Sequence, residues 1–225
     1  LSALRATQER LGLTNMVLCA RNGERLLANH PPCFDKVLVD APCSCEGTIR
    51  KKGRWSFTGE RGDFRAVLHA TQVRLLLNAL KLTKEGGRVV YSTCTLDPLE
   101  NEAVVEEALK RFEAEQGASA TLEPCAWDGF EAAEGLTSWE GRAFRAEMTR
   151  CARVYPHHND TGGFFIASLE VMSQPREGLN REGLLARGWK STAELPQADT
   201  APLFAWTEEV KGLPLSIYEG LSFIQ

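Results

Sequence analysis

Two cysteines lie in loops that directly follow predicted strands, where a side chain can act as a nucleophile. Cys43 lies in the sequence Ala-Pro-Cys-Ser-Cys and Cys94 in Ser-Thr-Cys-Thr, and each follows an apolar run that predicts a strand, 36–40 and 88–92. The carboxyl ends of neighbouring parallel strands meet at one edge of a sheet, so we expect both thiols to open into the same crevice. A thiol in such a loop, near helix N-termini, is a plausible low-pKa nucleophile.

The cysteines as a set argue against a disulfide framework and against a metal. There are seven, an odd number in a chain of 225 residues, and no Cys-x-x-Cys pair occurs. Cys43-Ser44-Cys45 has no matching second half, so we expect no zinc site. A redox sensor built on Cys43 and Cys45 is a weaker alternative, because one intervening residue strains a disulfide. Cys19 and Cys33 are interpreted as small buried side chains, Cys125 as structural or surface, and the free thiols indicate an intracellular protein.

The elements that must position these thiols alternate between helix and strand. Helices are expected over 1–11, over 67–82 and from Asp97 onward, and further strands over 15–20 and 164–171. Asp97 is the expected N-cap, with Pro98 at the first helical position, and Gly86-Gly87 is expected to cap the helix before it. This rhythm is typical of a doubly wound α/β fold with a parallel sheet.

Three segments carry a resemblance to a known family. They are VLVDAPCSCEGTIRK (37–51), GGRVVYSTCTLDPLENEAVV (86–105) and RVYPHHNDTGGFFIASL (153–169). Together they resemble the Sun-domain (NOL/NOP/Sun) RNA cytosine-5 methyltransferases over residues 1–171. Ser138-Trp139 and the run 148–153 are similar to the eukaryotic tRNA branch in particular.

The resemblance implies a Rossmann-like class I S-adenosylmethionine-dependent methyltransferase sheet and a covalent mechanism. Cys94 would attack carbon 6 of cytosine, carbon 5 would then take the methyl group, and Cys43 would assist product release. Asp40 would contact the cytosine ring edge or the cofactor. DNA cytosine-5 methyltransferases instead take their nucleophile from the Pro-Cys motif, which would put Cys43 first. The Ser-Thr-Cys sequence favours the RNA arrangement.

The same resemblance implies S-adenosylmethionine as cofactor, bound by Asn22, Gly23, Asp40 and Pro42. Asn22 stands where the family usually has an Asp for the adenine amino group, and its amide oxygen can still accept a hydrogen bond. A plain Asn-Gly turn is an equal alternative. The family's Gly-rich cofactor loop is not found in this sequence. We therefore expect Leu1 to lie mid-domain, with the N-terminal strands of the sheet and part of the cofactor site upstream.

Basic residues next to the Cys43 loop suggest contact with RNA phosphates: Arg50, Lys51, Lys52 and Arg54. The alternative is an ordinary solvated charge run. Trp55 and His69 could stack on a splayed base, and the family suggests that His157 lines the site. A cytosine in folded RNA must leave its stack to reach two thiols, which implies base flipping. The expected substrate is tRNA, with rRNA second. A non-catalytic RNA-binding scaffold is the alternative from another class.

Composition sets the outer bounds. A net charge of −4 excludes a wholly basic nucleic-acid-coating protein, though not a local basic patch. The sequence has no apolar run long enough for a transmembrane helix, and its charged start is unlike a signal peptide. We expect a catalytic domain over 1–172, a linker over 173–202 and part of an accessory domain over 203–225. We also expect a monomer, located in the nucleus or nucleolus if the source is eukaryotic and otherwise in the cytoplasm.

Overall fold

The computed structural model describes residues 2–27, 30–48 and 61–174, and the predicted linker and accessory domain lie outside these residues. The chain divides into two compact units. The larger spans His30–Gly178 and holds both cysteine loops, whereas Leu1–Asn29 belongs to the other. Within the described residues, no helix is both long enough and apolar enough to cross a membrane.

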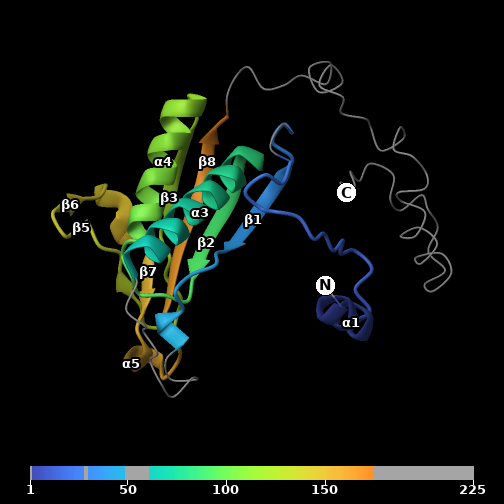
Figure 1. Cartoon of the computed structure of the whole chain (residues 1–225), viewed down its shortest axis with the longest axis horizontal. Coiled ribbons are helices and arrows are strands. Elements are labelled where there is room, and N and C mark those ends of the chain that lie inside the picture. Colours follow the sequence, from blue (N-terminus) through green and yellow to red (C-terminus); the bar gives the residue numbers. More distant parts are fainter. Residues whose placement is uncertain (1, 28–29, 49–60, 175–225) are drawn as a thin grey trace. The chain divides into compact units, whose positions relative to one another are not determined.

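A mixed sheet forms the frame of the larger unit (Figure 1). Its main strands are β1 (Phe34–Asp40), β2 (Thr83–Thr93), β8 (Phe164–Ser173), β7 (Ala152–Val154) and β4 (Ala133–Glu134), paired in that order, and β3 (Ser119–Glu123) also pairs with β8. β1 and β2 run parallel, whereas β8 is antiparallel to β2, β3 and β7. The predicted α/β sheet is confirmed, and the expected parallel pairing is found between β1 and β2, whereas the other described strands of this sheet pair antiparallel.

Two long helices cover one face of this sheet (Figure 1), α3 (Arg61–Leu82) and α4 (Glu102–Gln116). They bury alternate residues of the strands: Val89 and Tyr91 of β2 are fully buried, and Val37 and Val39 of β1 pack against the same core. Leu38, on the opposite face of β1, is 69% exposed. α4 ends at Gly117, whose φ of 58° is the left-handed conformation that favours glycine.

Short elements fill the chain between the main ones. They are η1 (Glu46–Thr48), the hairpin of β5 (Ser138–Trp139) and β6 (Arg142–Ala143), η2 (Ala146–Arg150) and α5 (Pro156–Asn159). η1 belongs to the Cys43 loop, and α5 contains His157.

Both predicted helix caps in the larger unit are wrong. α4 begins at Glu102 with Asn101 as its N-cap, because Asp97 closes a separate turn in which its Oδ1 accepts from the Leu99 N–H at 3.0 Å. α3 ends at Leu82 without Gly86-Gly87, because the chain turns directly into β2 and Thr83 Oγ1 donates to Ala79 O at 2.8 Å.

The N-terminal unit contains the predicted helix, α1 (Ser2–Leu11), but the strand predicted over 15–20 is wrong. Residues 16–20 have irregular backbone, because an extended segment becomes a strand only where a neighbour pairs with its N–H and C=O groups. In the described part of this unit, the Gln8 side chain instead ties the segment to α1, donating to Leu13 O at 3.2 Å and Met16 O at 2.7 Å.

Candidate active site

The two cysteine loops leave the sheet side by side. Parallel pairing puts Asp40 level with Ser92, so the last residues of β1 and β2 end at the same edge. The Cys43 and Cys94 Sγ atoms lie 3.4 Å apart, and both side chains are half-buried. The predicted convergence of these thiols is therefore confirmed.

Gly47 holds the loops together through its backbone. Its N–H donates to Cys94 O at 2.9 Å, and its carbonyl accepts from the Gly163 N–H at 2.9 Å. A Cβ at position 47 would overlap the carbonyl group of Gly163, so no residue with a side chain fits without separating the loops. The Cys43 loop, the Cys94 loop and the turn before β8 thus form one backbone assembly.

The buried carboxyl group of Glu100 fixes the loop between Cys43 and Cys45. Its Oε2 accepts from the Ser44 N–H at 3.0 Å and from Gln72 Nε2 at 2.9 Å, and its Oε1 contacts Ser44 Oγ. Gln72 also donates to Pro42 O at 2.7 Å, so α3 and Glu100 hold both sides of Cys43. Burial raises the pKa of Glu100, as does the nearby charge of Glu46, while these hydrogen bonds partly offset the increase.

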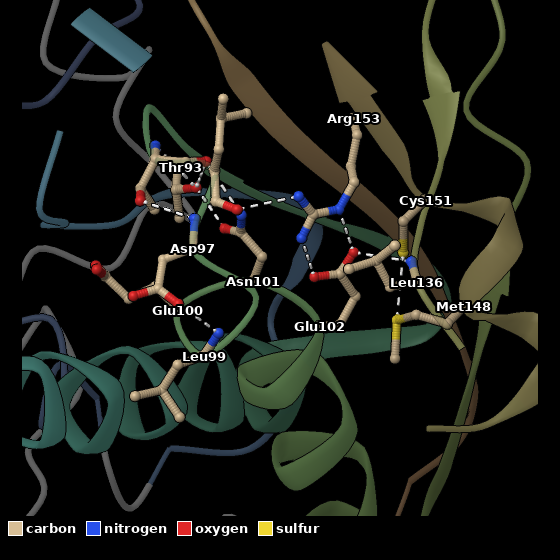
Figure 2. Close-up of polar contacts among 12 residues, drawn as sticks. Thr93, Asp97, Leu99, Glu100, Asn101, Glu102, Leu136, Met148, Cys151 and Arg153 are labelled. Atoms are coloured by element: carbon tan, nitrogen blue, oxygen red, sulfur yellow. Dashed lines mark hydrogen bonds and ion pairs between the residues drawn. The ribbon is translucent and has the colours of Figure 1, made fainter. Parts of the chain in front are cut away.

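The Cys94 loop is fixed by the N-cap of α4 (Figure 2). Asn101, fully buried, accepts at Oδ1 from Thr93 Oγ1 at 2.6 Å and donates from Nδ2 to Thr95 O at 3.1 Å. These two partners are the residues on either side of Cys94. The helix start therefore sets the position of the thiol through the chain on both sides of it.

The two thiols are not equivalent. Burial raises the pKa of both. The contact between the two thiols lowers the pKa of Cys94 and raises that of Cys43 further, whereas the neighbouring Cys45 thiol raises the pKa of Cys94. Both pKa values are raised above the usual range of a thiol, so the low-pKa nucleophile predicted from the sequence is wrong for either cysteine in this arrangement.

A buried ion pair braces the same end of the sheet (Figure 2). Arg153 of β7 binds both carboxylate oxygens of Glu102, at 2.6 and 2.5 Å, and donates to Leu96 O at 3.0 Å. Glu102 Oε1 also accepts from the Leu136 N–H at 2.9 Å. The pair connects the first turn of α4 to β7 and to the end of the Cys94 loop.

The remaining predicted site residues fall into three groups. Asp40 and Pro42 lie beside the thiols at the end of β1, where Asp40 Oδ1 accepts from Ser92 Oγ at 3.1 Å. Asn22 and Gly23 lie in the N-terminal unit, where Asn22 Oδ1 accepts from the Glu24 N–H at 2.8 Å in a local turn. His157 is exposed in α5, stacked on Tyr155 with ring centroids 5.8 Å apart.

The predicted basic contacts Arg50, Lys51, Lys52 and Arg54, and Trp55, lie outside the described residues. His69 has a structural role, because its ring nitrogens contact Leu99 O at 2.8 Å and Glu107 Oε2 at 2.9 Å and so tie α3 to the region of α4. Two of the predicted cysteine environments are wrong: Cys19 is exposed and Cys33 is half-buried.

Comparison with known proteins places the chain. The family model described as "16S rRNA methyltransferase RsmB/F" matches residues 1–170. The chain belongs to this family. Among curated relatives, a Pyrococcus abyssi tRNA (cytosine(49)-C(5))-methyltransferase is 41% identical over 143 residues, covering 63% of this chain and 43% of the relative. A Schizosaccharomyces pombe 25S rRNA (cytosine-C(5))-methyltransferase, nop2, is 32% identical, covering 88% of this chain and 32% of the relative.

Solved structures agree with the family. A methyltransferase homologue from Pyrococcus horikoshii matches with a TM-score of 0.60 and 33% identity, covering 75% of this chain and 48% of that one. NSun6 from the same organism, solved with the ligand SFG, also gives 0.60, at 28% identity, covering 77% and 39%. The chain spans less than half the length of these relatives, and its fold is that of S-adenosylmethionine-dependent methyltransferases.

Proposed function

We propose that the protein methylates carbon 5 of cytosine in RNA, with S-adenosylmethionine as methyl donor and tRNA as the first candidate substrate. The observation that carries the proposal is the 3.4 Å approach of the Cys43 and Cys94 sulfurs at the end of two parallel strands. The named activities of the relatives support the reaction class, and they include both tRNA and rRNA enzymes, so rRNA is the second candidate.

Cys94 supplies the nucleophile in this proposal. Carbon 5 of cytosine is too weak a nucleophile to take a methyl group unaided. Bond formation between Cys94 Sγ and carbon 6 makes carbon 5 enamine-like, so that it can accept a methyl group. S-adenosylmethionine, when bound, supplies that methyl group as an electrophilic methyl sulfonium.

Cys43 acts in product release. After methylation, carbon 5 must lose its proton before the Cys94–carbon 6 bond can break and return the electron pair to sulfur. Cys43 Sγ lies 3.4 Å from that sulfur, so we assign it the proton-transfer role and leave the attack to Cys94. Removing Cys43 should therefore leave the covalent adduct in place.

The described residues fit part of the cofactor. Asp40 presents an exposed carboxylate at the end of β1, held from one side by Ser92, and such an acceptor suits either a cationic part of the cofactor or a protonated cytosine ring nitrogen. Asp40 and Pro42 would thus line one side of the site. The assignment of Asn22 and Gly23 to the adenine side stays a prediction.

Trapping tests the reaction class. The complete protein is incubated with S-adenosylmethionine and either cytidine-containing or 5-azacytidine-substituted tRNA, and a parallel series uses rRNA fragments. We expect methylation of the first and a denaturation-resistant protein–RNA complex with the second. A non-catalytic scaffold would bind RNA and give neither product.

Variants of the two thiols test their roles. Cys94→Ala should abolish methyl transfer and trapping, whereas Cys43→Ala should accumulate a covalent complex with unmodified tRNA. Cys125→Ala, a substitution outside the site, is the matched control and should behave like the unsubstituted protein. Robust turnover by Cys94→Ala, or loss of the adduct in Cys43→Ala, would overturn the assignment.

The basic run Arg50, Lys51, Lys52 and Arg54 is proposed to contact RNA phosphates, because it directly follows the Cys43 loop in the sequence. Exchanging these residues for Gln should weaken RNA binding and flatten its salt dependence. His157 is exposed in α5, where its ring is accessible to a base, and we propose that it lines the RNA-facing side.

A further inference from the structure

A third thiol accompanies the two of the proposed reaction. Cys45 Sγ lies 3.9 Å from Cys43 Sγ, and the three sulfurs of Cys43, Cys45 and Cys94 all lie within 4.8 Å of one another. All three side chains are half-buried, so an ion from solvent can reach them. The reaction proposed above uses two of these thiols and leaves Cys45 without a role.

Cys45 occupies a costly backbone position. Its φ of 63° lies in the left-handed region, where glycine is the usual residue. A non-glycine residue there is strained and persists only where the surrounding structure fixes it. In this loop, the Ser44–Glu100 contacts on one side and the Gly47–Cys94 hydrogen bond on the other provide that constraint. In this position the Cys45 thiol donates to Cys43 O at 3.2 Å, and its sulfur lies within 4.8 Å of the other two.

The spacing of the sulfurs suits a metal ion. A tetrahedral zinc ion with Zn–S bonds of about 2.3 Å holds its sulfurs roughly 3.8 Å apart. The Cys43–Cys94 and Cys43–Cys45 distances, 3.4 and 3.9 Å, lie on either side of this value. Soft thiolate ligands select zinc and related thiophilic ions over magnesium or calcium.

The nearby carboxylates do not form a competing site of the same quality. Glu46, Asp97 and Glu100 also lie close together, but each already has a protein partner. Glu46 and Glu100 contact Ser44 Oγ, and Asp97 pairs with Arg65 at 2.5 Å.

We propose that Cys43, Cys45 and Cys94 form a binding site for a thiophilic divalent cation of the zinc class, with three protein ligands and one position open to solvent. This proposal replaces the expectation of no zinc site, because the fold brings Cys94 from a separate loop to Cys43 and Cys45. Binding replaces the protons of the three thiols with three sulfur–metal bonds and releases the protons to solvent. If the proposed function holds, the bound ion occupies both reacting sulfurs, so it keeps the enzyme inactive until the ion is removed.

Cadmium reports directly on such a site, because its bonds to thiolates give an ultraviolet charge-transfer band. The reduced, metal-free chain is titrated with Cd²⁺ and, separately, with Zn²⁺ by calorimetry. We expect one strong equivalent of each. Thiol counting with a chromogenic disulfide should then show three fewer reactive cysteines in the zinc-loaded chain, and a chelator should restore them.

Cys45→Ser tests the third ligand, with Cys125→Ser as the matched control. Loss of a metal ligand should weaken zinc binding at least roughly tenfold, since even removing a group that only supports a ligand weakens binding by that much. The control should bind like the unsubstituted chain. Equal affinity in Cys45→Ser and the control, or no stoichiometric binding at all, would overturn the site. These measurements use neither RNA nor S-adenosylmethionine, so their failure leaves the proposed methyl transfer standing.

Discussion

Glu100 and Glu102 lie two residues apart at the start of α4, and both are fully buried, yet their surroundings differ. Glu102 faces the Arg153 guanidinium, which binds both of its oxygens. Glu100 instead accepts hydrogen bonds from the neutral donors of Ser44 and Gln72. The charge of Glu102 is thus compensated by an opposite charge. Glu100 has hydrogen bonds from neutral donors instead, and its pKa is raised.

The two carboxyl groups therefore have different roles: Glu102 stabilises the fold, and Glu100 positions the thiol loop. The Glu102–Arg153 pair connects α4 to β7 and reaches the thiol loops only at Leu96 O, at the end of the Cys94 loop. Glu100 instead contacts Ser44, directly between Cys43 and Cys45. Breaking the first pair should therefore affect chiefly the stability of the fold, whereas changes at Glu100 should affect the geometry of the site.

The largest stability effect is expected from Arg153→Met. Removing one partner of a buried ion pair leaves the other charge uncompensated, which costs about 3–5 kcal/mol. Urea unfolding followed by circular dichroism measures the loss. Arg111→Met is the control, because its pair with Glu115 is exposed and worth less than about 1 kcal/mol. Equal losses in the two variants would contradict the assigned role of the pair.

Glu100→Ala should destabilise the chain less, by about 1–3 kcal/mol, because it leaves the Ser44 N–H and Gln72 side chain without their acceptor. The change that tests the role of Glu100 directly is in the reactivity of the thiols. With Ser44 released, Cys43 and Cys94 should react faster with an alkylating reagent than in the unsubstituted chain. Alkylation followed by peptide mass spectrometry measures both sites, and Glu115→Ala, at an exposed pair with Arg111 on α4, provides the comparison. Unchanged reactivity would show that Glu100 does not position the loop.

The smallest effect is expected from Glu100→Gln, which keeps an acceptor oxygen and removes the titration. Because folding raises the pKa of Glu100 above its usual 4.5, the stability that its protonated form contributes is full below that pH and falls as the pH rises toward the folded pKa. The slope is at most about 1.4 kcal/mol per pH unit. Urea midpoints measured upward from pH 4.5 should therefore decline more steeply in the unsubstituted chain than in the Glu100→Gln variant. Parallel declines would contradict the raised pKa.

The strands that position the site could be predicted from local sequence, because apolar runs indicate strands. The predicted strand 36–40 became β1 and 164–171 became β8, and the loops after β1 and β2 hold the two thiols. The strand predicted over 15–20 is wrong, because an apolar run alone does not supply a neighbouring strand to pair with.

The polar contacts within the site could not be read this way. Ser44 and Glu100 are separated by 56 positions, and Glu102 and Arg153 by 51, so no local pattern links them. Glu100 lies three residues after Asp97, the expected N-cap, and this spacing is typical of a helix start rather than of a contact with Ser44. The sequence shows Cys45 next to Cys43, but its proximity to Cys94 depends on how the two loops fold relative to each other.

Gly47 is a position at which a natural substitution would have a specific structural effect. Its neighbours leave no space for even a methyl group, while its N–H and carbonyl each join a different loop. A variant carrying alanine at this position would spread the three loops apart without changing Cys43 or Cys94. In a survey of homologous genes, an intact pair of cysteines beside a substituted glycine would therefore mark a copy that has kept its reactive groups and lost their alignment.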